Sequence, residues 1–210
     1  MKSTRNGTKS DEILARARRR GQGFARVDFR GHGDSGGNID SITISGLIAD
    51  IAAVVSHVGP CVLIGSSMGA LAAAWFAATD YRAAGSAGDV AALVLLSPAL
   101  GYLPEMTRKT DSYELRRSDE TLMTLQEKTL RDAKKYDESM LPRAIHVPLL
   151  VIHGGADRTV PRARSESFCR DVPHRDKEFW LIEGGSHSLN EDVGMVLDRV
   201  ESFLDERGLL

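Results

Sequence analysis

The stretch that decides the fold is Cys61-Val62-Leu63-Ile64-Gly65-Ser66-Ser67-Met68-Gly69. Its first four residues are apolar and include valine and isoleucine, which is typical of a buried strand. The alanine-rich run that follows, residues 68–78, predicts a helix. Between the two lies the pattern G-x-S-x-G, the context of a nucleophile elbow, in which a sharp turn exposes a serine hydroxyl at the end of a strand. Ser67 is therefore the candidate nucleophile.

The glycine pattern by itself is a weak signal. In a chain with 20 glycines it arises by chance in about one chain in ten, given ordinary serine usage. The alternative is a glycine turn whose serine only caps the next helix. A strained turn needs small residues on both sides of the serine, and Gly65 and Gly69 supply them. The position between a strand and a helix favours the nucleophile.

Strands and helices alternate on both sides of this unit. The patterns predict helices at residues 10–21, 44–58, 68–78, 162–170 and 192–207, and strands at residues 24–29, 61–64, 90–96, 149–152 and 178–182. Alternation of this kind predicts an α/β fold with a mostly parallel sheet flanked by helices. A chain of 210 residues is within the size of one domain, so residues 1–210 are predicted to form a single domain.

Residues 101–143 interrupt the alternation. They are rich in charged residues, carry leucines at helical spacings, and are too long for an ordinary connection. Two interpretations have nearly equal weight: an exposed helical insertion, or a cap that acts as a lid over a substrate pocket.

A serine hydroxyl needs a base to take its proton and a carboxylate to orient that base. His187 lies in a glycine-rich loop after the last predicted strand, and Asp157 lies in another after the preceding strand. Because parallel strands end at one edge of a sheet, these loops are expected to meet beside Ser67. His153 lies at the end of a strand, where packing or hydrogen bonding in place is the expected role. Ser67, Asp157 and His187 are thus the predicted catalytic residues.

The composition excludes several classes of protein. A net charge of −2 gives no reason to expect a nucleic-acid partner, and the only basic cluster, Arg16 with residues 18–20, is expected to be a solvated helix end. Cys61 and Cys169 have no metal-binding spacing and are expected to be buried, reduced thiols. Neither a secretory leader nor an apolar run of about 20 residues is found, so a cytoplasmic protein with no membrane span is expected.

Two segments resemble the α/β-hydrolase superfamily. Residues 28–35 (Asp-Phe-Arg-Gly-His-Gly-Asp-Ser) resemble the loop after its fourth strand, and residues 149–161 resemble its acid-bearing segment. Residues 7–9, 43–45 and 65–69 resemble a branch of small acyl-ester and acyl-thioester hydrolases. The resemblance implies acyl transfer through an acyl-Ser67 intermediate, a small-molecule acyl ester or thioester as substrate, and no metal or organic cofactor.

One departure from that family concerns the N-terminal part. Family members have three strands before the first helix, whereas here a helix begins near Ser10, which predicts an N-terminally truncated fold with a gap in the sheet between residues 24–29 and 61–64. The backbone N–H of Met68 would remain as one oxyanion donor, and loss of a second donor lowers the rate about a hundred- to a thousandfold. Because Met1-Lys2-Ser3 falls where the family continues from a His-Gly motif, the hypothesis is that this chain is a fragment or a mis-started reading of a longer protein.

Three functions stay open at this point. The first is an esterase or thioesterase. The second is a catalytically impaired or silent hydrolase fold used for binding, which the missing segment suggests. The third is acyltransferase or perhydrolase chemistry on the same fold.

Overall fold

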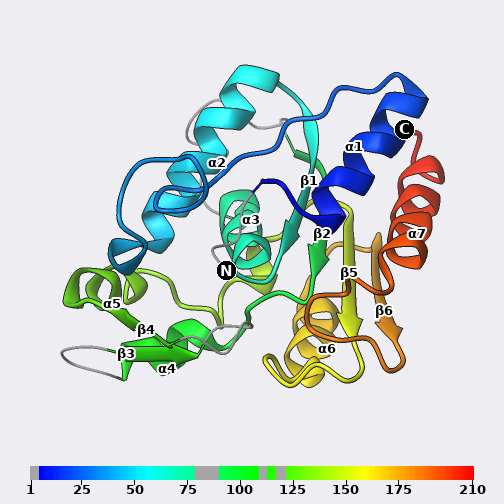
Figure 1. Ribbon diagram of the computed structural model, residues 1–210. Helices are drawn as coiled ribbons and strands as arrows, with labels where there is room; N and C mark the ends of the chain where they lie inside the picture. The colour runs from blue at the N-terminus through cyan, green and yellow to red at the C-terminus, as the bar shows by residue number, and fades with distance from the viewer. Residues whose placement is uncertain (1–4, 79–89, 109–112, 117–121) are drawn as a thin grey trace.

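The computed structural model describes residues 5–78, 90–108, 113–116 and 122–210, and its elements follow the predicted alternation (Figure 1). The helices are α1 (Thr8–Arg20), α2 (Ile44–Val58), α3 (Met68–Ala78), α4 (Tyr102–Thr107), α5 (Glu127–Ala133), α6 (Arg162–Asp171) and α7 (Val193–Asp205), with short 3-10 turns at Ile39–Ser41 and Pro142–Ala144. The strands are β1 (Cys61–Ser66), β2 (Val90–Leu96), β3 (Tyr113–Arg116), β4 (Leu122–Leu125), β5 (Leu149–Gly154) and β6 (Lys177–Ile182).

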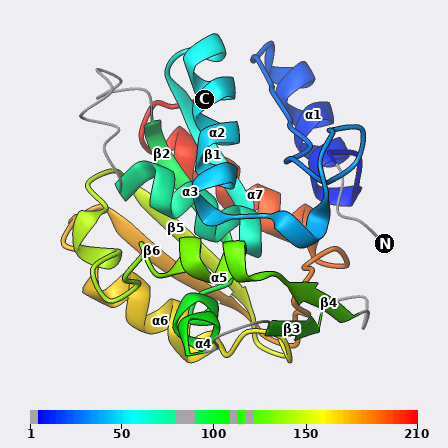
Figure 2. The same cartoon turned by 90° about the vertical axis from the view of Figure 1, so that its left-hand side faces the viewer.

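The main sheet has four parallel strands in the order β1-β2-β5-β6. Alternate residues of β2 face opposite sides, as the strand period requires. Leu93 and Leu95 pack in one apolar cluster with residues of α2, α3 and α6, whereas Val94 and Leu96 pack in a second cluster with residues of α7. The sheet therefore has helices on both faces, which confirms the predicted α/β class (Figures 1 and 2).

Residues 24–29 do not form the predicted strand. Among the described residues β1 is the edge of the sheet, and a cavity of about 1280 Å³ lies along it, lined by residues 23–29 on one side and residues 60–69 on the other. A strand needs a neighbour with which to exchange backbone hydrogen bonds. The prediction of a strand at residues 24–29 is therefore wrong, because the cavity lies between these residues and β1. The cavity is at the place where a gap in the sheet was expected.

The insertion at residues 101–143 contains helices α4 and α5, as expected, and also β3 and β4, an antiparallel pair that the sequence did not predict. Residues 109–112 and 117–121 of the insertion, and Met1-Lys2-Ser3, lie outside the described residues. A role of the insertion as a lid stays a prediction, as does the single-domain organisation.

Asp132 attaches the insertion to α2. Its carboxylate is buried and accepts hydrogen bonds from the backbone N–H of Ser45 (2.9 Å) and from the Ser45 hydroxyl (2.6 Å), and Lys135 lies 2.9 Å away. Burial raises the pKa of the Asp132 carboxyl, but the Ser45 hydrogen bonds and the Lys135 ammonium outweigh it, so the pKa lies below its usual range.

We expect Asp132→Asn to lower the free energy of unfolding by about 1–3 kcal/mol at neutral pH, because hydrogen bonds to a charged group are lost. The folded pKa is depressed, so the contribution of the carboxylate is present above the unfolded pKa of about 3.9 and is lost as the pH falls through the folded value. Asparagine does not titrate. In urea unfolding between about pH 6 and pH 3, the difference between the two proteins should narrow on acidification; a constant difference would contradict this account.

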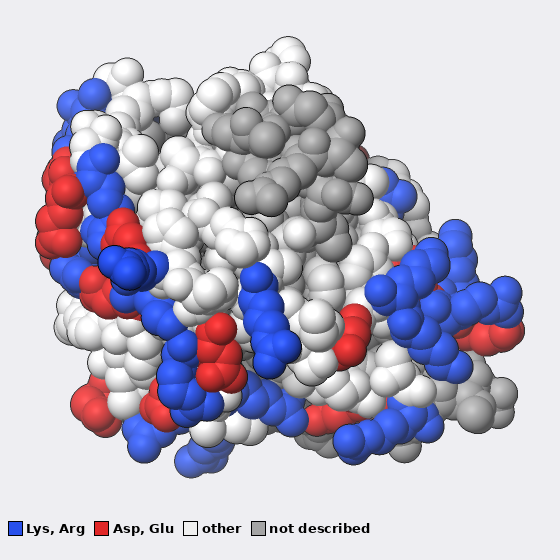
Figure 3. Space-filling view, turned by 180° about the vertical axis from the view of Figure 1, so that it is seen from behind, with Lys and Arg blue, Asp and Glu red and all other residues white. Residues whose placement is uncertain are grey.

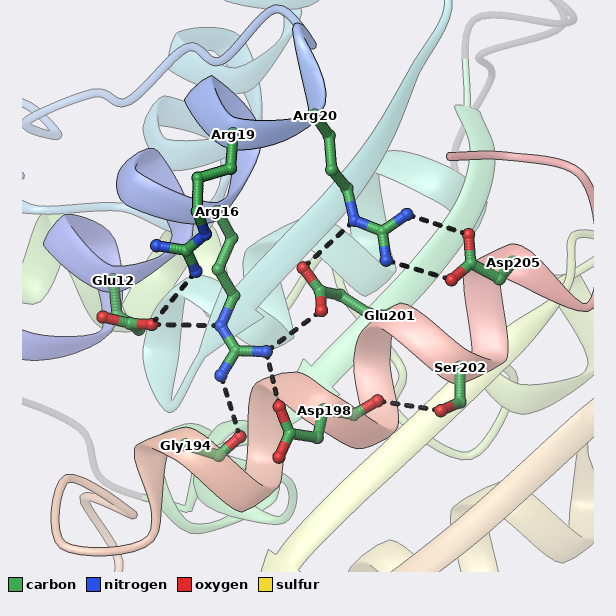
Figure 4. Close-up of polar contacts among 9 residues, drawn as sticks. All are labelled: Glu12, Arg16, Arg19, Arg20, Gly194, Asp198, Glu201, Ser202 and Asp205. Carbon is green, nitrogen blue, oxygen red and sulfur yellow. Dashed lines mark hydrogen bonds and ion pairs between the residues drawn. The ribbon is translucent and has the colours of Figure 1, made fainter.

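The basic cluster at the end of α1 was expected to be a solvated helix end, and this is wrong for Arg16, whereas Arg20 is exposed although it forms an ion pair. Arg16 is 14% exposed and pairs with Asp198 (2.6 Å) and Glu201 (3.1 Å) of α7, while Arg20 pairs with Asp205 (3.1 Å) (Figure 4). Basic and acidic side chains also lie next to one another along the left-hand margin of Figure 3. The cluster therefore binds α1 to α7, a pairing of two helices distant in sequence.

Neither Cys61 nor Cys169 forms a disulfide within the described residues. Cys169 is buried, as expected, whereas Cys61 is only half-buried, so the expectation of burial is wrong for Cys61. Within the described ranges, no helix has the length and apolar character that a membrane crossing demands.

Candidate active site

The structure brings the three predicted residues together at the carboxyl ends of the parallel strands. Nε2 of His187 lies 2.9 Å from Oγ of Ser67, and Nδ1 of His187 lies 2.7 Å from Oδ2 of Asp157. An ionised carboxylate can only accept hydrogen bonds, so Nδ1 carries the hydrogen and Nε2 is left to accept from the serine hydroxyl. The arrangement can transfer the hydroxyl proton to the imidazole.

Ser67 occupies a strained turn between β1 and α3. Its φ of +53° is in the left-handed region, which non-glycine residues adopt rarely. A Cβ on Gly65 would lie 2.6 Å from Cα of Ala70 and 2.7 Å from the carbonyl oxygen of Gly69, so only glycine fits there. A Cβ on Gly69 would meet only a Phe29 ring carbon at 3.5 Å. Of the two glycines expected to be necessary, Gly65 alone is required by close contacts.

The loops that carry Asp157 and His187 are held together by their backbones. The N–H of Gly155 donates to Ile182 O (2.8 Å), and the N–H of Ala156 donates to Gly185 O (2.9 Å). A Cβ on Gly154 would lie 2.4 Å from the carbonyl oxygens of Gly185 and Ser186. Glycine at the end of β5 therefore allows the close approach that places the imidazole beside the carboxylate.

The carboxylate of Asp157 is buried and has four donors around it. Oδ1 accepts from the backbone N–H groups of Thr159 (2.7 Å) and Val160 (3.0 Å), and Oδ2 lies 2.7 Å from His187 Nδ1 and 3.1 Å from His153 Nε2. Burial raises the pKa of this carboxyl, but the hydrogen bonds from His153, His187 and Val160 outweigh it and hold the pKa well below the usual range. Asp157 is therefore ionised at neutral pH.

The sequence did not predict that His153 contacts Asp157 in this site. Packing and hydrogen bonding in place were expected, and the buried ring does form hydrogen bonds. The signal present in the sequence was the four-residue spacing to Asp157 across a glycine turn, which by itself does not show that the chain folds back.

Ser67, Met68 and His187 line the cavity beside β1, together with many apolar side chains, including Ile13, Phe24, Val27, Val54, Leu197 and Val200. Met68 is the first residue of α3, as its predicted role as an oxyanion donor requires; that role stays a prediction. In the described part of the chain, no group of three or more His, Cys, Asp or Glu side chains is arranged to hold a metal ion.

Comparisons with known proteins agree with this architecture. A sequence model of the family described as serine aminopeptidase, S33, matches residues 6–139 and 121–193. The palmitoyl-protein thioesterase ABHD10, mitochondrial, of Bos taurus is 24% identical over 97% of this chain and 70% of its own length, and that of Homo sapiens is 24% identical over 96% and 69%.

Two solved structures share the fold. Est1E from Butyrivibrio proteoclasticus, solved with ferulic acid bound, has a TM-score of 0.81 at 23% identity and covers 98% of this chain and 85% of its own. Mouse alpha/beta hydrolase domain-containing protein 10 has a TM-score of 0.83 at 21% identity, with 97% and 86% covered. The chain belongs to the serine aminopeptidase, S33, family and, through it, to the α/β-hydrolase superfamily.

Proposed function

We propose that this protein is a serine hydrolase that cleaves a carboxylic ester or thioester through an acyl-Ser67 intermediate. The observation that carries the proposal is the continuous hydrogen-bonded chain from Ser67 Oγ through His187 to Asp157 Oδ2, with separations of 2.9 and 2.7 Å. Serine, histidine and aspartate in this order of contact form the arrangement that activates a hydroxyl for acyl transfer. The proposed mechanism needs no metal or organic cofactor.

In the proposed reaction, His187 Nε2 takes the proton of Ser67 Oγ as the oxygen attacks the carbonyl carbon of the substrate. The resulting oxyanion is stabilised by the backbone N–H of Met68, and Asp157 stabilises the imidazolium. His187 then gives the proton to the leaving alcohol or thiol, and an acyl ester remains on Ser67. Water, deprotonated by His187, attacks this ester and releases the carboxylic acid, which restores the free serine.

The cavity and the relatives support an apolar acyl group as the substrate. Ser67 and His187 open into the cavity along β1, whose lining as a whole is rich in aliphatic and aromatic side chains, and such a surface favours the transfer of a hydrocarbon chain from water. The curated relatives are named palmitoyl-protein thioesterases, and one structural neighbour was solved with ferulic acid. A panel of acyl esters and thioesters of graded chain length distinguishes the acyl group and the leaving group.

We expect a fluorophosphonate probe to label the protein once, on Ser67, and Ser67→Ala to abolish both the labelling and hydrolysis of an activated ester. The reason is that the probe reacts with a hydroxyl whose proton a neighbouring base removes. The measurement is the intact mass of the protein before and after the probe, with circular dichroism to show that both proteins are folded.

Ser66→Ala is the matched control, because Ser66 is the last residue of β1, next to the nucleophile in the chain, and has no predicted role. This variant should keep the adduct. An adduct that persists in Ser67→Ala contradicts the assignment. A folded wild-type protein that takes no label and hydrolyses no ester favours the silent binding fold, and a product formed only with an alcohol or peroxide acceptor favours transferase or perhydrolase chemistry.

A further inference from the structure

His153 is fully buried at the end of β5, and all of its polar contacts are to residues of the loop and helix that follow. Its Nε2 atom lies 3.1 Å from Asp157 Oδ2 and 3.1 Å from the carbonyl oxygen of Val160, and its Nδ1 atom lies 2.9 Å from Ser165 Oγ. The Asp157 side chain is 1% exposed and the His153 side chain is 0% exposed. Water is therefore not available at this point to replace either partner.

The partners determine where the hydrogen of the ring lies. A carboxylate oxygen and a carbonyl oxygen both accept and never donate, so Nε2 must carry a hydrogen. It donates this hydrogen to the Val160 carbonyl, and Asp157 Oδ2, also 3.1 Å from Nε2, is the second acceptor beside it. The Ser165 hydroxyl can supply a hydrogen to Nδ1, which fixes the ring at its other side. Oδ2 of Asp157 consequently has two imidazole N–H groups near it, that of His153 at 3.1 Å and that of His187 at 2.7 Å.

We infer that His153 is a positioning residue, which acts through Asp157 and holds Oδ2 in the direction of His187. This inference rests on the proposed function. The two backbone N–H groups hold Oδ1 and give the carboxylate plane its general direction. The contact from His153 is made to Oδ2 itself, so it adds the restraint that sets the angle at which Oδ2 meets the Nδ1–H of His187. Removal of this donor should loosen the alignment of His187 without changing the cavity that receives substrate.

The test compares His153→Phe, which removes the donor and keeps a ring, with His153→Gln, whose side-chain amide N–H can reach the same acceptors. We expect His153→Phe to lower kcat about ten- to a hundredfold, the usual effect of losing a residue that orients a ligand or catalytic group, with KM within about twofold of the wild type. His153→Gln should recover most of kcat.

A second measurement does not depend on activity. The Nδ1 proton of His187, in its 2.7 Å hydrogen bond to Asp157, should give a downfield proton NMR resonance. In His153→Phe this resonance should move upfield and broaden, and in His153→Gln it should return toward the wild-type position. If wild-type protein hydrolyses no ester, the proposed function fails, but the NMR comparison still decides the role of His153.

Asp132→Asn is the control for general destabilisation. Its buried carboxylate accepts hydrogen bonds from the Ser45 N–H (2.9 Å) and hydroxyl (2.6 Å) and does not line the cavity that holds Ser67 and His187. It should lower stability without moving the resonance or kcat. If His153→Phe does not fold, Ser165→Ala takes its place in the test, because it removes the hydrogen bond on Nδ1 of His153. It should displace the His187 Nδ1 resonance in the same direction, by less than is expected for His153→Phe. The inference is overturned if the resonance does not move in folded His153→Phe, or if His153→Gln recovers neither kcat nor the resonance position relative to His153→Phe.

Discussion

Asp157→Asn is expected to lower kcat by about four orders of magnitude, the effect of the same change in a serine protease, while the protein stays folded. The backbone N–H groups of Thr159 and Val160 point at Oδ1, so they select the amide rotamer whose oxygen faces them. The amide nitrogen then takes the place of Oδ2 and donates to His187 Nδ1. The imidazole is forced into the tautomer with a hydrogen on Nε2, which cannot accept the proton of Ser67.

The measurement is kcat for an activated ester, together with the unfolding midpoint in urea. Asp176→Asn is the matched control, because this carboxylate pairs with Arg207 and is more exposed. It should leave kcat within about twofold, as expected for a surface pair away from the reacting groups. More than a tenth of wild-type kcat in Asp157→Asn would show that this carboxylate does not set the tautomer of His187.

Gly65→Ala should have the second large effect, on both folding and rate. The added Cβ would lie 2.6–2.8 Å from backbone atoms of Ala70 and Gly69, and backbone cannot move aside as a flexible side chain does. Overpacking of this kind costs about 1–3 kcal/mol. Any shift of the turn also displaces Ser67 from His187, and a displacement of about 1 Å lowers the rate about a hundredfold.

Gly194→Ala is the matched control for Gly65→Ala. It lies in α7, has no atom within 4 Å of its added Cβ, and does not have a positive φ. Alanine is the better helix former, so this variant should be more stable by up to about 1 kcal/mol, with unchanged kcat. In urea unfolding, Gly65→Ala should therefore be less stable than the wild type and Gly194→Ala more stable. In ester hydrolysis, only Gly65→Ala should be slower. Equal behaviour would mean that the close contacts at Gly65 do not constrain the turn.

The local sequence pattern is sufficient to specify some strands and helices of this protein. Residues 90–96 and 68–78 form the predicted strand and helix with the predicted bounds, because an uninterrupted apolar run and an alanine-rich run each have one favourable local structure. Residues 24–29 are a shorter apolar run that includes Arg26 and Asp28, and they form no strand, because a strand also requires a neighbouring strand, which a local pattern does not report.

Several ion pairs and hydrogen bonds also depend on the tertiary fold and not on the local sequence. Arg16 was expected in solvent because basic residues near a helix C-terminus complement the helix dipole. Besides Glu12 of its own helix, it pairs with Asp198 and Glu201, which lie more than 180 residues later in the chain. The contact of His153 with Asp157 is close in sequence, but it exists only because the chain turns back at Gly154 and Gly155.

The sequence by itself determined the α/β class, the strand–turn–helix unit around Ser67, and the chain order of Ser67, Asp157 and His187, because these depend on residue type and local spacing. Only the tertiary structure decided the 2.7 and 2.9 Å separations, the cavity along β1, the pairing of α1 with α7, and the second imidazole on Asp157. The physical reason is that a hydrogen bond or ion pair forms only when its two atoms are placed correctly to within a few tenths of an ångström, and packing of the whole molecule sets the positions of segments far apart in the chain.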